Sequence, residues 1–416
     1  MARLILVIVI LLVSLAYAIG SGFTLLYRFS YLLALLLIFG YIWSHYILRG
    51  LNVIVERRFK HSTVGEHIEE RITVNNLWLF PKPWFEVEDK TDLPGFQTGR
   101  VISLGAKGYR TWLSRVECTR RGEFTVGPLV ATASDPFRIF RISKTFGKSQ
   151  RLLVYPATVD LPFFYLPRTR LAGEAPTRRS IPHNTPSASS VREYAPGDNL
   201  SRIHWSSTAH TGRLMTKEFD LEPASDMWIV ADMEQQVQAG EAEESTEEYT
   251  VTIAASLASK FLSQDVPVGI LLNASDALIV RSERGQQQLD HLMESLAVVK
   301  ADGKIGLPES LESNVGRFGT ASSLVIITPN PTERLSSVLS QLSSRGIKSS
   351  VIILDLASFG KKTDVEIISS SSRWISALGS PVYTIRRGDI FSKTLETAVY
   401  QGRTEVTRDG KLQHTR

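Results

Sequence analysis

The chain has 416 residues, of which 43% are hydrophobic and 21% are charged. This length and composition allow two or three domains with a substantial core and exclude a wholly disordered chain. The net charge of +5 is modest, and no basic stripe with interleaved aromatic residues occurs, so nucleic-acid binding is not expected. The single cysteine, Cys118, cannot form an internal disulfide, which fits a reducing compartment.

Two apolar segments open the sequence. Residues 4–20 carry no charge and would form a helix of roughly 25 Å, and residues 29–48 would form one of roughly 30 Å. The short stretch between them allows only a turn, so we expect a transmembrane hairpin over residues 1–50. Its loop carries a single basic residue, whereas several flank its outer ends: Arg3, Arg49, Arg57, Arg58 and Lys60. This distribution predicts a multi-pass protein of the cell membrane, with both termini and the soluble body in the cytoplasm.

A cleaved signal peptide is the alternative interpretation of the first segment. Arg3 gives it a positive start, and Ala16-Tyr17-Ala18 resembles a cleavage site. The length of the apolar run and the second span that follows favour the hairpin. Cleavage would instead turn the body outward.

The soluble body divides into a β-rich part and an α/β part. Residues 51–166 contain short runs with alternating apolar positions, separated by turn residues, which predicts a sandwich-like domain of antiparallel strands. Residues 167–190, rich in proline, serine and arginine, are typical of a linker. In residues 191–416, continuous apolar strands such as residues 323–328 alternate with helices, which predicts a mostly parallel sheet covered on both faces.

The most distinctive segment of the chain is SVREYAPGDNLSRIHWSSTAHTGRLMTKEFD, residues 190–220. We expect Asp198 or Asn199 to cap a short helix through Ile203 and Trp205, and a cluster of charges to hold the segment against the α/β domain. If the segment has a structural role, Trp205 should be buried and its replacement by alanine should destabilise the fold. If the segment is a binding surface, Arg202→Ala should leave the melting temperature nearly unchanged and abolish partner recovery. The candidate signature or interaction residues are Arg192, Glu193, Tyr194, Gly197, Asp198, Arg202, His204 and Trp205.

This segment resembles the signature of a bacterial family known only as domain of unknown function 58. Asp135-Pro136-Phe137 matches a further segment of that family, and the resemblance extends to the two N-terminal helices. It implies a C-terminal domain similar to von Willebrand factor type A, and partners such as a MoxR-type AAA+ ATPase or a transglutaminase-like protein. His210 departs from the family pattern, in which an arginine is more common.

A metal site is the second functional hypothesis. Type A domains often bind Mg²⁺ through an Asp-x-Ser-x-Ser loop, and here the corresponding residues 232–236 read DMEQQ. Asp232 is the only ligand of that loop that remains, so we expect no cofactor, with Mg²⁺ at Asp232 as the alternative. We favour the simpler explanation of Asp232, a carboxylate at the sheet end that caps a helix or pairs with an arginine.

No catalytic residues are expected. The sequence lacks the nucleophile elbow, the P-loop, the dinucleotide fingerprint and the zinc-protease motif. Asp198, His204, Ser206 and Ser207 lie too close in sequence to converge on one carbonyl. We therefore expect a membrane-anchored, non-enzymatic scaffold or adaptor that binds a protein. The alternatives are a Mg²⁺-dependent adhesion-like module and an envelope-associated hydrolase.

Overall fold

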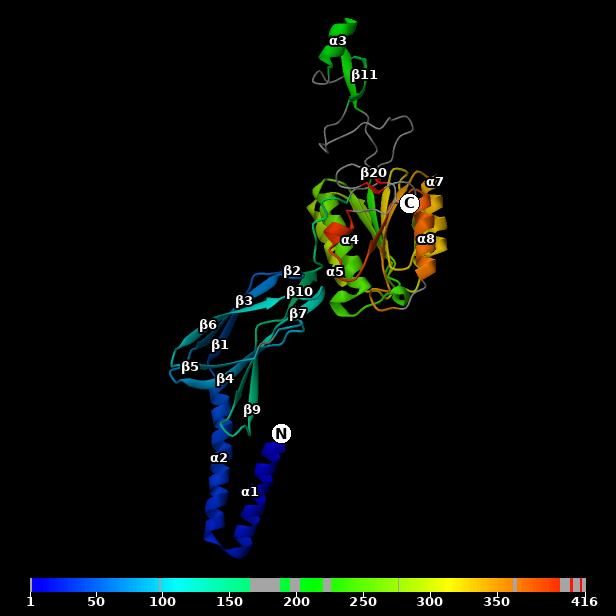
Figure 1. Cartoon of the computed structure of the whole chain (residues 1–416). Helices are drawn as coiled ribbons and strands as arrows, with labels where there is room; N and C mark the ends of the chain where they lie inside the picture. The colour runs from blue at the N-terminus through cyan, green and yellow to red at the C-terminus, as the bar shows by residue number, and fades with distance from the viewer. Residues whose placement is uncertain are drawn as a thin grey trace. The chain divides into compact units, whose positions relative to one another are not determined.

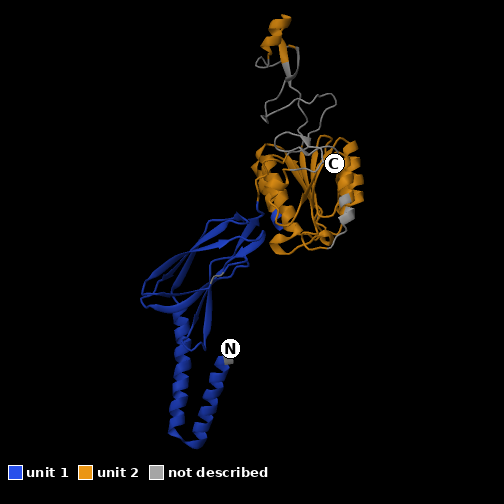
Figure 2. Cartoon of the chain, in the orientation of Figure 1, with its two compact units in different colours: residues 1–157, 296–298 blue, residues 158–295, 299–416 orange. Residues whose placement is uncertain are grey.

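The computed structural model describes residues 2–96, 99–164, 188–194, 203–219, 226–275, 277–361, 365–396, 405–406 and 412–413. The chain forms two compact units, residues 1–157 with 296–298 and residues 158–295 with 299–416 (Figure 2). The second unit begins at Thr158, before the linker expected from residue 167. The reason is that residues 158–164 pack on its helix α4 (Thr246–Ser263), where the Val159 amide donates to Ser256 and the Lys260 amine donates to the carbonyl of Phe164.

Two antiparallel helices begin the first unit, α1 (Ala2–Ser21) and α2 (Thr24–Leu48) (Figure 1). Both are long and apolar enough to cross a membrane, and most of their side chains are exposed. The hydroxyls of Ser14 and Ser30 lie 2.8 Å apart and join the two helices. The second helix begins five positions before the predicted start at residue 29, because Arg28 interrupts the apolar run but remains a good helix former.

The rest of the first unit is β-rich, as predicted. Its strands form three sheets with the orders β1-β3-β6, β2-β10-β7 and β5-β4-β8-β9. All pairs in them are antiparallel except β2 with β10. The strands are β1 (Leu51–Arg57), β2 (His61–Thr63), β3 (His67–Asn76), β4 (Lys82–Asp89), β5 (Arg100–Leu104), β6 (Tyr109–Glu117), β7 (Gly122–Val126), β8 (Leu129–Ser134), β9 (Arg141–Phe146) and β10 (Gln150–Tyr155).

A buried lysine joins the end of α2 to this β-rich body. Lys82, the first residue of β4, is fully buried and donates from its amine to the carbonyl oxygen of Tyr46. The amine also lies 4.0 Å from the ring centroid of Tyr46 and 4.9 Å from that of Trp78. The Tyr46 carbonyl, near the helix C-terminus, also accepts from the Arg49 backbone amide (3.3 Å), so the lysine gives it a second donor. Only Arg49 and Gly50 separate α2 from β1 at this point.

The second unit is built on a six-stranded sheet with the order β15-β14-β13-β16-β17-β18. Five strands are parallel, and the edge strand β15 is antiparallel to β14. Every residue of β13, β14 and β16 is buried, which explains their continuous apolar sequence. These strands are β13 (Met227–Ala231), β14 (Val268–Leu272), β15 (Leu278–Glu283), β16 (Ser323–Thr328), β17 (Lys348–Leu354) and β18 (Val382–Ile385).

Helices cover both faces of this sheet (Figure 1). Residues of α6 and α7 share a buried cluster with Trp228 and Val230, whose side chains point to one face of β13. The intervening Ile229 faces the other side. The expected mixture of strands and helices is therefore confirmed. The further helices are α5 (Gln286–Val298), α6 (Leu307–Asn314), α7 (Glu333–Ser344), α8 (Val365–Ala377) and α9 (Phe391–Thr394), and a short pair of strands is formed by β19 (Glu405–Val406) and β20 (Leu412–Gln413).

The buried position of Lys82 predicts a pH-dependent stability. Burial lowers the pKa of Lys82 from 10.5 to about 8. Between these pH values the unfolded chain holds a proton that the folded chain does not, so the free energy of unfolding rises with pH. Below pH 8 both states are protonated and the contribution is constant. In the Lys82→Met variant this contribution is absent.

We therefore expect the melting temperature of the wild type, minus that of Lys82→Met, to increase from pH 7.5 to pH 10. This difference in melting temperature is measured by thermal melts of the full chain in detergent, with circular dichroism as the readout. Lys90→Met, which removes an exposed lysine, controls for the loss of one charge. If the difference in melting temperature between wild type and Lys82→Met stayed constant across this pH range, Lys82 would keep its ordinary pKa.

Candidate functional site

The strand order of the six-stranded sheet reverses between β13 and β16. From β13 the chain proceeds outward to β14 and β15, and then returns to β16 on the other side of β13. Crevices at the carboxyl ends of parallel strands, next to such a reversal, are the usual ligand sites of α/β sheets. Asp232 directly follows β13, Thr328 ends β16 and Asn273 directly follows β14. The sheet thus brings these three polar side chains to one edge.

Asp232 is almost completely buried there, with 2% of its surface exposed. One carboxylate oxygen accepts a hydrogen bond from the Thr328 hydroxyl (2.7 Å). The other accepts from the Asn273 side-chain amide (3.1 Å) and from the Glu234 backbone amide (3.2 Å). Burial raises the pKa of Asp232, and these hydrogen bonds partly oppose the shift. Asn273 in turn accepts from the Met233 amide and donates to the Ile305 carbonyl, so the network fixes three loops.

The donor set around Asp232 differs from a Mg²⁺ site. Both carboxylate oxygens already accept hydrogen bonds from protein donors, whereas Mg²⁺ requires several oxygens that converge in an octahedron. Glu234 is close enough for Asp232 to raise its pKa, after the larger effect of burial. Within the described ranges, no group of three or more His, Cys, Asp or Glu side chains is arranged to hold a metal ion. The geometry fits a carboxylate that holds loops together at the sheet edge.

The described part of the signature segment is a small hairpin that carries a helix. Strands β11 (Ala188–Glu193) and β12 (Met215–Phe219) pair antiparallel, and α3 (Trp205–Thr211) lies between them in sequence. The Tyr194 amide donates to the Leu214 carbonyl, and the His204 amide donates to the Met215 carbonyl (both 2.8 Å). These hydrogen bonds link different parts of the signature segment to one another.

His204 caps α3 and is not part of it. Its Nδ1 accepts a hydrogen bond from the Ser207 amide (3.2 Å) and lies 2.7 Å from the Ser207 hydroxyl. The prediction of a helix through Ile203 is therefore wrong: Ile203 forms a β-bridge with Thr216, and the helix starts at Trp205. Asp198 and Asn199, the predicted caps, lie outside the described residues. The short His204–Ser207 contact is explained by capping.

The other predicted signature residues lie in different positions. Trp205 is 69% exposed, which does not fit the packed role that we considered for it. Glu193 and Arg213 form an exposed ion pair at 3.5 Å, and the exposed His210 lies in the last turn of α3. Arg192 lies within β11. Gly197, Asp198 and Arg202 lie outside the described residues, so the expected charge cluster stays a prediction.

Asn273 and Thr328 were missed as site residues from the sequence, and Ser207 was considered only for a catalytic role. For Asn273 a signal was present, because a polar residue ends the apolar run of residues 266–272 and parallel strands end at the same sheet edge. For Thr328 no such signal is present. Its pairing with Asp232 depends on the register of β13 against β16, in which Ala231 pairs with Ile327.

A structural role of Asp232 leads to a prediction about its removal. In Asp232→Ala, the Thr328 hydroxyl and the Asn273 amide lose their buried acceptor, which costs about 1–3 kcal/mol of the free energy of unfolding. Thermal melts of the full chain should show the same loss with and without Mg²⁺. If Mg²⁺ raised the melting temperature of the wild type and left that of the variant unchanged, the site would be a metal site.

Comparison with known proteins agrees with the family resemblance that the signature segment carries. The family described as "Protein of unknown function DUF58" matches residues 190–355. "Uncharacterized protein YeaD" of Bacillus subtilis (strain 168) is 21% identical over 277 residues, 65% of this chain and 68% of that protein. Among solved structures, the CARDB domain of PF1109 from Pyrococcus furiosus is 18% identical (TM-score 0.19; 25% of this chain, 94% of that one). The pilus adhesin SpaC of Lactobacillus rhamnosus GG is 10% identical (TM-score 0.32; 43% and 30%). The match over residues 190–355 and the distant likeness to YeaD are consistent with a protein of the DUF58 family.

Proposed function

We propose that this protein is a membrane-anchored, non-enzymatic scaffold or adaptor whose signature segment binds a protein partner. The observation that carries the proposal is the exposure of Trp205, at 69% of its surface, on a segment that its own hydrogen bonds hold in shape. Tryptophan is enriched among the residues that dominate the energy of protein interfaces. A large exposed aromatic residue on a pre-ordered element fits an interface better than a folding role.

The anchor in this proposal is the α1–α2 hairpin, inserted in the cell membrane with the soluble body in the cytoplasm. Two helices of sufficient length and apolar character support insertion, and the basic residues at the outer ends of the hairpin support the cytoplasmic side. The partner that we propose is a MoxR-type AAA+ ATPase, as the family resemblance implies, with a transglutaminase-like protein as a further member of the assembly.

The finer description of the two soluble parts belongs to the same proposal. We infer that the sheets β1-β3-β6, β2-β10-β7 and β5-β4-β8-β9 form a sandwich-like domain. We also infer that the α/β sheet is similar to a von Willebrand factor type A domain. Its strand order, with one antiparallel edge strand and a polar site at the reversal, supports this assignment. An adhesion-like activity that requires Mg²⁺ is the alternative that the Asp232 experiment decides.

The binding proposal is tested with Trp205→Ala in the full chain. Tagged wild type and tagged variant are purified from gently solubilised membranes, with the ATPase held in several nucleotide states. We expect the variant to lose the ATPase that the wild type recovers. Because Trp205 is exposed, its replacement should change the free energy of unfolding by no more than about 0.5 kcal/mol. Trp374→Ala is the matched control, since Trp374 is also an exposed tryptophan of the second unit (65%).

Equal recovery of the ATPase by wild type and Trp205→Ala, or failure to recover it in any nucleotide state, would contradict this proposal. A loss of several kcal/mol in Trp205→Ala would return the residue to a structural role, as first considered from the sequence.

The scaffold and the envelope hydrolase differ in the side of the membrane on which the body lies. An experiment that determines this side needs an accessible thiol. Cys118 is fully buried, and burial raises its pKa, so it reacts poorly. Ser103→Cys places a thiol on an exposed position of β5 instead. We expect a membrane-impermeant maleimide to label this thiol only after the cells are broken. Labelling of intact cells would place the body outside and favour the hydrolase.

A further inference from the structure

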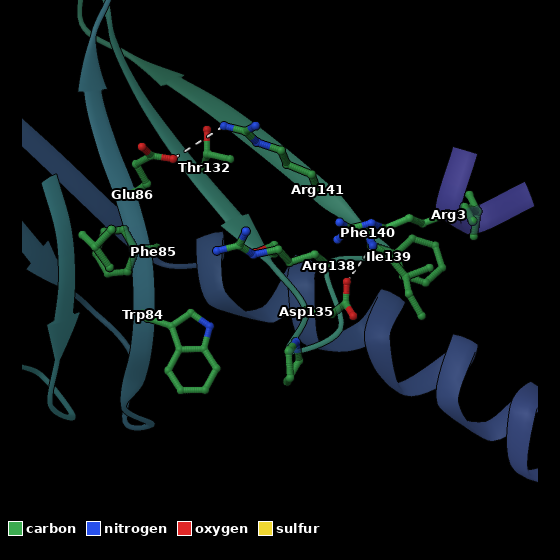
Figure 3. A pocket seen from close by; sticks show the side chains of 14 residues that line it. Arg3, Trp84, Phe85, Glu86, Thr132, Asp135, Arg138, Ile139, Phe140 and Arg141 are labelled. Atoms are coloured by element: carbon green, nitrogen blue, oxygen red, sulfur yellow. Dashed lines mark hydrogen bonds and ion pairs between the residues drawn. The ribbon is translucent and has the colours of Figure 1, made fainter. Parts of the chain in front are cut away.

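A cavity of about 1010 Å³ lies in the first unit, where the β-rich body meets the helix hairpin (Figure 3). Its wall is formed mainly by β4, by β8 and by the loop of residues 135–140, and the start of α1 lines one side. The loop is fixed by Asp135, whose carboxylate accepts from the backbone amides of Phe137 (3.0 Å) and Phe140 (2.6 Å). The Asp-Pro-Phe segment noted in the sequence therefore shapes this cavity.

The helix register places the cavity at the end of the membrane spans. Ser14 of α1 and Ser30 of α2 face each other across the hairpin. Arg3 lies eleven residues before Ser14 and Tyr41 lies eleven residues after Ser30, so the two residues are at the same level. The Tyr41 ring packs against the ring of Phe140, with centroids 5.8 Å apart, and a side chain at Gly40 would also meet Phe140. The loop of residues 135–140 therefore lies beside α2 at the same level as Arg3. The cavity thus opens where the apolar part of α1 begins.

Three arginines from different elements line the cavity. They are Arg3 from the start of α1, Arg138 from the loop and Arg141 from β9. Arg141 lies 3.5 Å from Glu86 in a partly exposed ion pair. Within the described part of the chain, the guanidinium groups of Arg3 and Arg138 have neither a hydrogen bond nor an ion pair, and both side chains are exposed. The lining holds three arginines against two carboxylates, Glu86 and Asp135, so it carries one net positive charge.

We propose that this cavity binds the phosphate headgroup of an anionic phospholipid. Arginine forks match phosphate oxygens in geometry and charge. The apolar surface of the first turns of α1, where Ile5 and Leu6 are 59% and 60% exposed, provides the adjoining contact for an acyl chain. Trp84 lines the cavity and Phe137 lies in its loop, and their exposed rings (46% and 55%) suit the headgroup region of a bilayer. A soluble phosphate compound would use the arginines but leave this apolar surface unused.

The proposal depends on the insertion of the hairpin in a membrane and is independent of the partner of Trp205. The test uses the full chain, purified in a non-ionic detergent and freed of lipid. Dioctanoyl phosphatidylglycerol, dioctanoyl phosphatidylcholine and inorganic phosphate are titrated separately, and native mass spectrometry measures the dissociation constant of each. The test variant combines Arg3→Gln with Arg138→Asn, because asparagine tolerates the left-handed φ of 53° at position 138.

We expect the wild type to bind the phosphatidylglycerol in preference to both other probes, and the double variant to bind it about ten-fold more weakly. The matched control is Arg110→Gln with Arg120→Gln, which removes two exposed arginines elsewhere in the first unit and should bind as the wild type does. If the double variant melted at a lower temperature, the single variant Arg138→Asn would be compared instead.

Equal affinity of the wild type and the arginine variant for the phosphatidylglycerol would overturn the proposal. Equal affinity of the wild type for inorganic phosphate and for the phospholipid would also overturn it, because the cavity would then be a site for free anions. Recovery of the variant in the membrane fraction, together with normal partner capture, separates a failure of the lipid site from a failure of the anchor or of the Trp205 surface.

Discussion

The contact on which the first unit depends is that of the Lys82 amine with the end of α2. A helix that leaves a membrane must satisfy its last carbonyls without help from the hydrocarbon. Lys82 adds a donor to the Tyr46 carbonyl beside the Arg49 amide, and the rings of Tyr46 and Trp78 lie next to the amine. The same residue begins β4, the strand that pairs with both β5 and β8. One buried side chain therefore connects the anchor to the body's sheet. The depressed pKa of Lys82 reflects the cost of holding an amine in that position.

The second unit is organised by a different constraint, the reversal of its strand order. Three polar residues end neighbouring parallel strands at this point, and each would be costly to bury alone. Asp232, Asn273 and Thr328 satisfy one another, so the place where such a sheet usually binds a ligand contains an internal network. The signature segment differs, because the large side chain of Trp205 is exposed to solvent although the backbone of the segment is hydrogen-bonded. This contrast is why we place recognition on Trp205 and not on Asp232.

The second unit was the easier part to predict from sequence. Strands buried on both faces, such as β16, are continuous apolar runs that need no knowledge of their neighbours. Strand β9 has a weaker signal, because its sequence RISKTF lies mostly in solvent and lacks alternation. Helix α6 has recognisable start signals, which are Pro308 near its start and Glu309, whose carboxylate accepts a hydrogen bond from the Gly306 amide. Lys82 and the arginine cavity could not be predicted, because both depend on contacts between distant segments.

The direct passage from α2 into β1 has a mechanical consequence. With only Arg49 and Gly50 between helix and strand, and with Lys82 holding the joint, the β-rich body cannot turn independently of the hairpin. Helices in a bilayer change their tilt when its thickness changes. With the hairpin inserted as we propose, each such change would tilt the β-rich body together with the hairpin. The orientation of the body relative to the membrane would then follow the thickness of the bilayer.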